Sequence, residues 1–341
     1  MKQMLVTQEI QVMAQEYADN LFADKTEAFV QPTEGLDNLL TDIIELNKTL
    51  PNKYDFVAYL EKLIEDFETL KNLLPSKFNE YKKDFDELLS PSLLSTPIEC
   101  RKTRLPEEDA ERAALSVRKA KFYEEVVARM RYEDARPVMA EYMEKIGIQT
   151  CVYCNNAEAV YSEKDKEAYY HFDHWKPKDK YPFLSICFYN LYPCCANCNG
   201  HKLDKSKGPF QLYAEEGPTK DPFVFWVDRS QYVARKPDTL SVGFNPRDNS
   251  DNEYCKEYDK VYRIKNFYNS PGGLRQVSKL ITDIDKHRGS YLDATEKSFP
   301  GIVNKEELFH DVLGVDGDEE NIFTDIKKKL KLDTAKDAKL L

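Results

Sequence analysis

Two pairs of cysteines with the spacing Cys-x-x-Cys constrain this 341-residue chain more than any other feature. The first pair is Cys151 and Cys154, the second is Cys195 and Cys198, and 40 residues lie between the pairs. Each pair directs two thiolates at one point, and two pairs complete the tetrahedral four-sulfur set that suits Zn²⁺. The sequence therefore predicts a structural zinc site, and the alternative is four buried free thiols.

The rest of the chain favours metal binding over disulfides. The N-terminal segment lacks the uninterrupted apolar stretch of a signal peptide, because Gln8, Glu9 and Gln11 break it. No window approaches the roughly 18 apolar residues of a membrane span. These observations predict a cytoplasmic, reducing location without a membrane partner, where clustered cysteines more often hold a metal.

The charge of the chain limits how it can meet nucleic acid. Its 49 Lys and Arg against 60 Asp and Glu give a net charge of −11, which excludes a general basic coat for DNA. Residues 1–99 alone carry 9 basic and 19 acidic groups and sum to −10. Residues 171–210 reverse the sign, and their lysines are expected to contact phosphates, with a merely solvated loop as the alternative. The lysines assigned to this contact are Lys176, Lys178, Lys180, Lys202 and Lys205.

The patterning predicts an α+β chain in three parts. Residues 1–145 form an acidic helical domain that serves as a bundle or as a docking surface, with amphipathic helices at 35–50, 54–74 and 106–145. Pro137 is expected to kink or divide the last of these. Residues 146–210 form a zinc-stapled central module. Residues 211–341 form a mixed α/β region that packs on it, with strands at 223–228, 239–244 and 260–267 and helices at 274–298 and 303–332. The lysines at 327–331 are read as the basic end of that last helix.

The segment that contains both cysteine pairs resembles the HNH, or ββα-metal, endonucleases. Type, order and spacing agree over about 55 residues, and the matching residues are Cys151, Cys154, Asp173, His174, Pro177, Asn190, Leu191, Pro193, Cys195, Cys198, Asn199 and Lys202. The resemblance implies a ββα-metal nuclease module that hydrolyses DNA phosphodiester bonds. It also implies that Asn190 orients the loop around the catalytic histidine. Asn199 stands where the family often has His, and His201 is kept as an alternative ligand.

The residue types support this chemistry on their own. His174 has an ordinary pKa that suits a general base near neutral pH. Asp173 and Asn199 offer two hard oxygen ligands to one cation, which favours Mg²⁺ or Mn²⁺ over Zn²⁺. His171 lies two residues before Asp173 and shares its strand face, where it supports the site or simply packs.

A narrower resemblance links the chain to HNH nucleases of bacterial anti-phage defence systems, of the Septu type or associated with retrons. It is carried by the stretch that starts at Asp173 and by the Pro-Phe segments downstream. This resemblance implies an effector subunit with a protein partner, often an ATPase. Two alternatives stay open: an HNH nuclease that cleaves RNA, and a zinc-stapled adaptor that binds nucleic acid or protein without catalysis.

Overall fold

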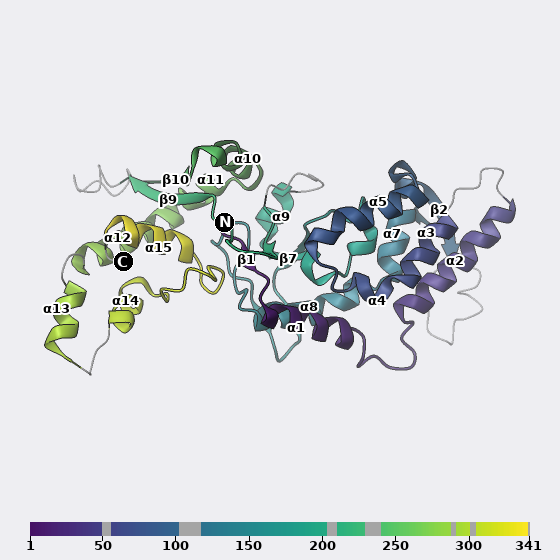
Figure 1. Cartoon of the computed structure of the whole chain (residues 1–341), viewed down its shortest axis with the longest axis horizontal. Helices are drawn as coiled ribbons and strands as arrows, with labels where there is room; N and C mark the ends of the chain where they lie inside the picture. The colour runs from purple at the N-terminus through teal and green to yellow at the C-terminus, as the bar shows by residue number, and fades with distance from the viewer. Residues whose placement is uncertain are drawn as a thin grey trace.

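The arrangement of the chain is elongated, with helices at both ends and small sheets distributed among them (Figure 1). The structure is a computed structural model that describes residues 1–49, 56–101, 117–202, 210–228, 240–287, 291–300 and 305–339. Within these ranges the chain is a mixed α+β protein with many helices and five two-stranded sheets. No helix in the described ranges is both long and apolar enough to cross a membrane.

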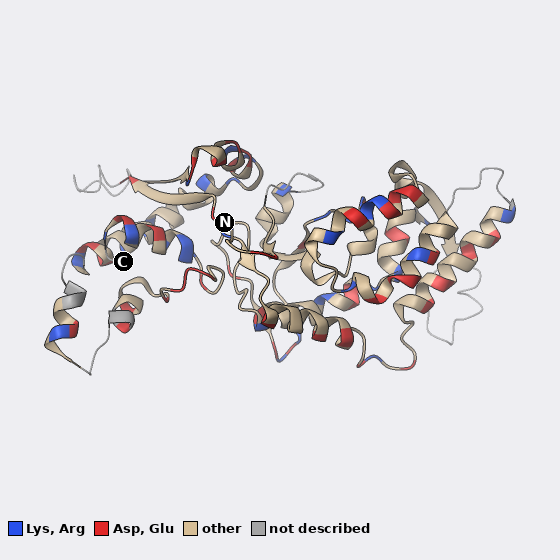
Figure 2. Cartoon of the chain, in the orientation of Figure 1, with Lys and Arg blue, Asp and Glu red and all other residues tan. Residues whose placement is uncertain are grey.

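The N-terminal end is built from amphipathic helices, as the sequence predicts, but the single helix predicted at 54–74 is divided after Glu65 and ends at Leu70. In α3, Phe56, Leu60 and Leu63 recur at spacings of three and four and are buried. Acidic and basic residues alternate along these helices (Figure 2). The helices are α1 (Gln8–Asn20), α2 (Pro32–Thr49), α3 (Phe56–Glu65), α4 (Phe67–Leu70) and α5 (Phe78–Leu88).

The predicted helix at 106–145 is only partly present. Residues 102–116 lie outside the described ranges, and β3 (Val117–Lys121) pairs antiparallel with β2 (Pro97–Arg101), so a helix over 117–121 is wrong. The helices that follow are α7 (Phe122–Arg129) and α8 (Tyr132–Lys145). The chain divides at Arg131, whose φ of 60° is left-handed, and the division expected at Pro137 is wrong. Pro137 lies inside α8, where it removes a single backbone donor.

The central part consists of two short hairpins and one helix. Strands β4 (Tyr161–Ser162) and β5 (Glu167–Ala168) form the first hairpin, and β6 (His171–His174) pairs antiparallel with β7 (Leu191–Cys194) in the second. Helix α9 (Ala196–Lys202) follows β7. The chain start joins this part, because β1 (Met4–Leu5) pairs in parallel with β8 (Tyr213–Ala214). No local pattern predicts that pairing, since its strands are about 200 residues apart.

The C-terminal part begins with the strands expected there. Strands β9 (Phe223–Asp228) and β10 (Ser241–Pro246) form an antiparallel pair, which confirms two of the three predicted strands. The third is wrong, because 260–267 is helical in α10 (Asn252–Tyr262) and α11 (Ile264–Tyr268). Tyr258, Val261 and Tyr262 are buried at helical spacing, so the aromatic run that suggested a strand is one face of a helix. The remaining helices are α12 (Pro271–His287), α13 (Tyr291–Ser298), α14 (Lys305–Leu313) and α15 (Lys328–Asp337).

The lysine run near the C-terminus has the opposite role from the one predicted. The helix predicted at 303–332 is interrupted between Leu313 and Lys328, so the lysine run begins α15 instead of ending a helix. A basic start is unfavourable for the helix dipole. Carboxylates compensate, because Lys328 lies 2.6 Å from Asp316 and Lys329 lies 2.6 Å from Asp221. Both lysines are buried, and these ion pairs join α15 to segments that lie before it in the chain.

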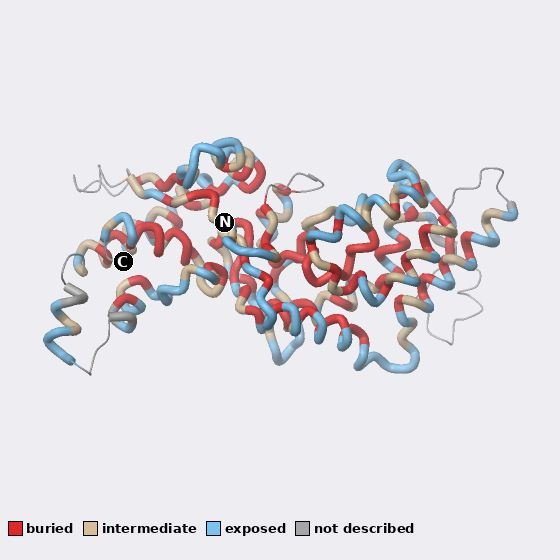
Figure 3. The backbone as a smooth tube through the Cα atoms, in the orientation of Figure 1, coloured by how far each residue is buried: buried red, intermediate tan, exposed pale blue. Residues whose placement is uncertain are grey.

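Buried apolar side chains connect all three parts of the sequence. One contiguous hydrophobic cluster runs from Met1 through the central hairpins to Leu330, and Figure 3 shows buried backbone continuing from the helices into the centre. A second, small cluster joins α12, α14 and α15 around Ile284 and Phe309. The central hairpins therefore pack against helices from both sides.

Candidate metal and nucleic-acid site

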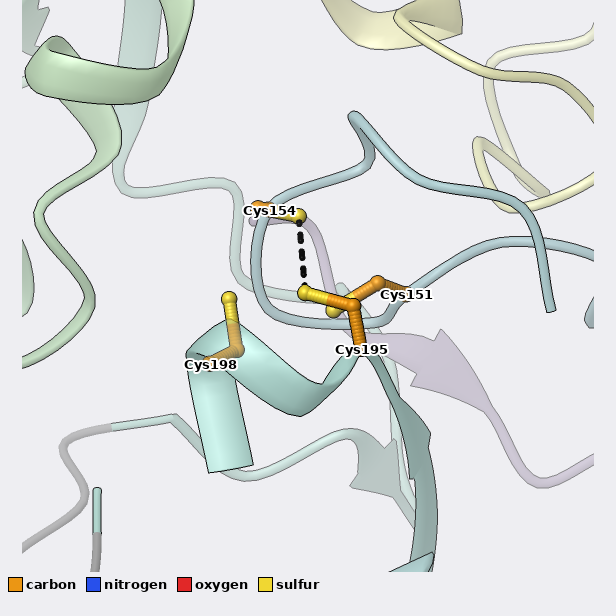
Figure 4. A group of neighbouring side chains, drawn as sticks. All are labelled: Cys151, Cys154, Cys195 and Cys198. Carbon is orange, nitrogen blue, oxygen red and sulfur yellow. Dashed lines mark hydrogen bonds between the residues drawn. The ribbon is translucent and has the colours of Figure 1, made fainter. Parts of the chain in front are cut away.

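The four cysteines of the two pairs come together in the structure. Their Sγ atoms all lie within 4.8 Å of one another, and those of Cys154 and Cys195 are 4.0 Å apart (Figure 4). A tetrahedral zinc ion with Zn–S bonds of about 2.3 Å requires sulfurs about 3.8 Å apart. The donor type, number and spacing fit that ion, so the four cysteines could hold a metal such as zinc.

Local backbone turns present these sulfurs. Cys151 and Cys154 flank a turn closed by the Asn155 amide, which donates to the Cys151 carbonyl at 2.8 Å. Cys195 and Cys198 sit at the start of α9, directly after β7. Hydrogen bonds from Cys151, and then from Cys154, lower the pKa of the Cys195 thiol, whereas bonds within the same group raise the pKa of Cys198. The adjacent Cys194 is outside the group, and its thiol donates to the His171 carbonyl at 3.5 Å.

Asn155 is a structural residue that the sequence reasoning missed. It is fully buried with a left-handed φ of 47°. Its side-chain Nδ2 lies 2.9 Å from Thr150 Oγ1 and from the carbonyl oxygens of Ile322 and Asp325, and these three acceptors share its two hydrogens. Its side-chain oxygen accepts from the Lys329 amide at 3.2 Å. The first cysteine turn is thereby tied to the segment that leads into α15.

Asp173 lies near the end of β6, opposite Tyr192, and only 8% of it is exposed. Its Oδ2 accepts hydrogen bonds from the Tyr153 hydroxyl and the Lys202 ammonium. Burial raises the pKa of the Asp173 carboxyl, and the Lys202 ammonium and Tyr153 hydroxyl act in the opposite direction. No spacing signal in the sequence pointed to Tyr153 as a partner of this carboxylate.

His174 ends β6 and is also 8% exposed. Its Nε2 lies 3.0 Å from the Ser185 carbonyl oxygen, which can only accept, so Nε2 carries the proton and Nδ1 keeps its lone pair. Burial lowers the pKa of His174 to about 3, the bond to Ser185 opposes this, and Lys178 and Lys202 lower it further. The Tyr132 ring lies 4.7 Å from the imidazole. The histidine is thus neutral at neutral pH.

Asn190 closes the long connection between β6 and β7. Its Oδ1 accepts from the Lys176 amide at 2.7 Å, and its Nδ2 donates to the carbonyls of Lys176 and Leu184 at 3.2 and 3.1 Å. The side chain is fully buried, so these bonds fix the loop that carries Ser185, the partner of His174.

Asn199 faces β6 from α9. Its Nδ2 lies 3.5 Å from Nδ1 of His171, and His171 is exposed. His201 lies near α11, with its ring 6.1 Å from that of Phe267. The structure therefore places Asn199 and His171 together and His201 elsewhere.

The lysines assigned to phosphate contacts are in different environments. Lys178 and Lys180 are exposed, and Lys176 is half-buried with its ammonium 4.3 Å from the centre of the Trp175 ring. Burial lowers the pKa of Lys176. Lys202 is 1% exposed and its ammonium is bonded inside the protein, so a phosphate contact from it requires that ion pair to open. Lys205 lies outside the described residues.

Comparison with curated proteins gives a similarity over a short segment. Septu protein PtuB from Bacillus thuringiensis is 43% identical to the chain over 61 residues, which are 17% of this chain and 22% of that protein. The matched segment thus spans about a fifth of the relative's length. No protein-family description matches the chain, and no solved structure matches it significantly.

Proposed function

We propose that the chain is a metal-dependent HNH-type endonuclease that hydrolyses phosphodiester bonds of DNA. The observation that carries this proposal is that β6 and α9 bring the predicted polar residues to one place, linked by the ion pair between Asp173 and Lys202. Asp173 and His174 end the strand, Asn199 lies on the helix, and Lys202 bridges back to Asp173. The four cysteines hold the start of α9 where it follows β7, and β7 pairs with β6, so the polar side chains are held on a rigid frame.

His174 acts as the general base in this proposal. It accepts at Nδ1 the proton of a water molecule whose oxygen attacks phosphorus, while the phosphorus–oxygen bond on the opposite side breaks. The bond from Nε2 to Ser185 and the Asn190 bonds to the loop hold the ring in position. Solvent returns a proton to the leaving oxygen.

Asp173 and Asn199 are the proposed ligands of the divalent cation. Asp173 Oδ1 accepts no hydrogen bond from any described residue, and the Asn199 amide adds a second hard oxygen, so the donor set fits Mg²⁺ or Mn²⁺. When bound, such a cation neutralises charge on the phosphate and the leaving oxygen. Exposed Lys178 and Lys180 contact the flanking phosphates without reading sequence.

The test compares cleavage by the wild-type chain and by His174→Ala on supercoiled plasmid, single-stranded DNA and RNA, with and without Mg²⁺ or Mn²⁺. We expect metal-dependent cleavage of DNA that His174→Ala abolishes with zinc content unchanged. The matched control is His310→Ala, an exposed histidine of α14. If His174→Ala still cleaves, His174 is not the general base. If RNA is cleaved and DNA is not, the substrate in the proposal is RNA.

A second candidate is an adaptor that binds nucleic acid or protein through the cysteine-braced unit without cutting. The low exposure of Asp173 and His174 favours it, because each is 8% exposed in the described chain. Binding of an oligonucleotide that is equal in wild type and His174→Ala, with no cleavage in any metal, would select this candidate.

We further propose that the protein acts in anti-phage defence together with a protein partner such as an ATPase. This rests on the segment shared with Septu protein PtuB and on the acidic N-terminal helices, which offer a docking surface. Phage plating on cells that carry the gene with its genomic neighbours tests it. We expect the gene to lower the number of phage plaques and His174→Ala to abolish this protection. Equal plaque numbers with and without the gene contradict the role.

A further inference from the structure

The two oxygens of the Asp173 carboxylate have different surroundings. Oδ2 accepts from both Tyr153 and Lys202, whereas Oδ1 accepts no hydrogen bond from the described residues. Only Oδ1 is therefore left to bind a cation, so the carboxylate can act only as a monodentate ligand.

The Lys202 ammonium is held deep inside the unit. Besides Asp173 Oδ2, it donates to the His174 carbonyl at 2.8 Å and lies 3.4 Å from the Trp175 carbonyl, so the end of β6 occupies all three of its donors. The lysine is 1% exposed, and its carboxylate partner is 8% exposed. Little water screens this ion pair, so its charges act strongly on anything bound at Oδ1.

Tyr153, the second partner of Oδ2, is fixed from the C-terminal side. It is fully buried, its ring stacks on Tyr262 with centroids 4.3 Å apart, and its carbonyl accepts from the Tyr258 hydroxyl. Both neighbours belong to α10. The carboxylate is thus locked on one side by α9 and on the other by a residue that α10 supports.

The groups bonded to Asp173 leave it with no net charge. Asp173 and Lys202 sum to zero wherever the proton between them lies, Tyr153 adds a neutral hydroxyl, and the amide of Asn199, the second proposed ligand, is neutral. Among the described residues, the four cysteines are the only group of three or more His, Cys, Asp or Glu ligands gathered within 4.8 Å, so Asp173 does not belong to a multi-carboxylate cluster. Affinity for hard cations rises with the number of charged ligands, and the charge of Asp173 is already balanced by Lys202.

On the basis of the proposed function, we propose that Lys202 makes cation binding depend on substrate. The site binds Mg²⁺ or Mn²⁺ weakly on its own and binds it firmly when a nucleic-acid phosphate supplies the missing negative charge next to Asp173 Oδ1. Lys202 is then a positioning residue that sets the order of assembly, and it is not a phosphate ligand. The chain would stay without its catalytic cation until DNA arrives.

The test measures Mn²⁺ affinity by calorimetry and by electron paramagnetic resonance, with the zinc-loaded full chain. We expect weak, millimolar binding to wild type alone and at least tenfold tighter binding with a phosphorothioate oligonucleotide that resists cleavage. Lys202→Met leaves Asp173 uncompensated, and we expect it to bind Mn²⁺ alone about tenfold more tightly, because a repelling unit charge near the cation is gone. The matched control is Lys71→Met, a buried lysine in the N-terminal part, which should leave the affinity unchanged.

Micromolar Mn²⁺ binding to the wild-type chain without oligonucleotide overturns the inference, as does equal binding with and without it. A folded Lys202→Met variant that binds Mn²⁺ alone no more tightly than wild type also overturns it. If Lys202→Met does not fold, as judged by zinc content and circular dichroism, Lys202→Gln replaces it in the same comparison. The plasmid assay reads the proposed function separately. Cleavage together with tight binding of Mn²⁺ alone rejects only this inference, whereas absence of cleavage in any metal rejects the function.

Discussion

Acid should destabilise the protein through His174, and the size of the effect follows from its burial. In the folded chain the pKa of His174 is lowered to about 3, from an ordinary value of 6.5. The unfolded chain therefore binds one proton more than the folded chain between these two values. Stability is complete above pH 6.5 and falls as the pH drops toward 3, because protons favour the unfolded state there.

The magnitude can be worked out at pH 5. There the imidazole is almost fully protonated in the unfolded chain and neutral in the folded chain. Because pH 5 lies about 1.5 units below the ordinary pKa, the free energy of unfolding falls by about 2 kcal/mol. This is a large share of the roughly 5–15 kcal/mol by which domains are usually stable.

The assay is urea unfolding at pH 7.5, 6 and 5 for wild type and for His174→Gln, which cannot take up a proton. We expect the wild type to lose about 2 kcal/mol more than the variant between pH 7.5 and pH 5. Loss of a cysteine-bound metal in acid affects both proteins equally and cancels in the difference. His310→Gln, at an exposed position, should follow the wild type. Equal pH slopes in wild type and His174→Gln would refute the reasoning.

Two further predictions concern the frame of the site. Cys151→Ser should lose bound zinc, measured by elemental analysis, and should unfold at a lower urea concentration, since a structural metal contributes folding free energy; a wild-type chain purified without zinc contradicts it. Asn155→Ala removes, from a buried, left-handed residue, the side-chain oxygen that accepts from the Lys329 amide and the Nδ2 group whose two hydrogens serve three acceptors. We expect a loss of about 3 kcal/mol in urea unfolding, because buried partners are left unpaired. Stability within about 0.5 kcal/mol of wild type contradicts this.

Local patterns predicted those parts of the protein that local physics determines. The spacing of each cysteine pair brings two sulfurs together within one turn, and the structure gathers the four predicted sulfurs. The strand at Phe223–Asp228 and the amphipathic helix at Phe56–Glu65 follow from periods of two and of 3.6 residues. The strand predicted at 260–267 was wrong, because a short aromatic run fits either period. Only the burial of Tyr258 and Tyr262 on one face identifies a helix.

The sequence alone could not identify which carboxylates pair with the buried lysines. Lys202 was read as a surface cation because six lysines cluster in 171–210, yet its ammonium is buried against Asp173. The lysines of α15 were misread for the same reason, since Asp221 and Asp316 compensate them from distant segments. A lysine in a sequence carries no sign of whether a carboxylate will meet it in the fold, so charge clusters alone cannot separate phosphate contacts from internal ion pairs.

The same long-range contacts show why the C-terminal part bears on the site. Asn155 bonds to the segment that enters α15, the Tyr268 hydroxyl donates to the Cys154 carbonyl at 2.9 Å, and Tyr258 donates to the Tyr153 carbonyl. Each of these bonds reaches the first cysteine turn, and that turn carries Tyr153, which holds Asp173 Oδ2. Through Tyr153, the position of the proposed cation ligand therefore depends on α10, and through Asn155 the first cysteine turn is tied to the segment that enters α15. A partner protein that binds the C-terminal helices would act on the site through these hydrogen bonds. A partner that binds the acidic N-terminal helices would have to act through the packed hydrophobic core.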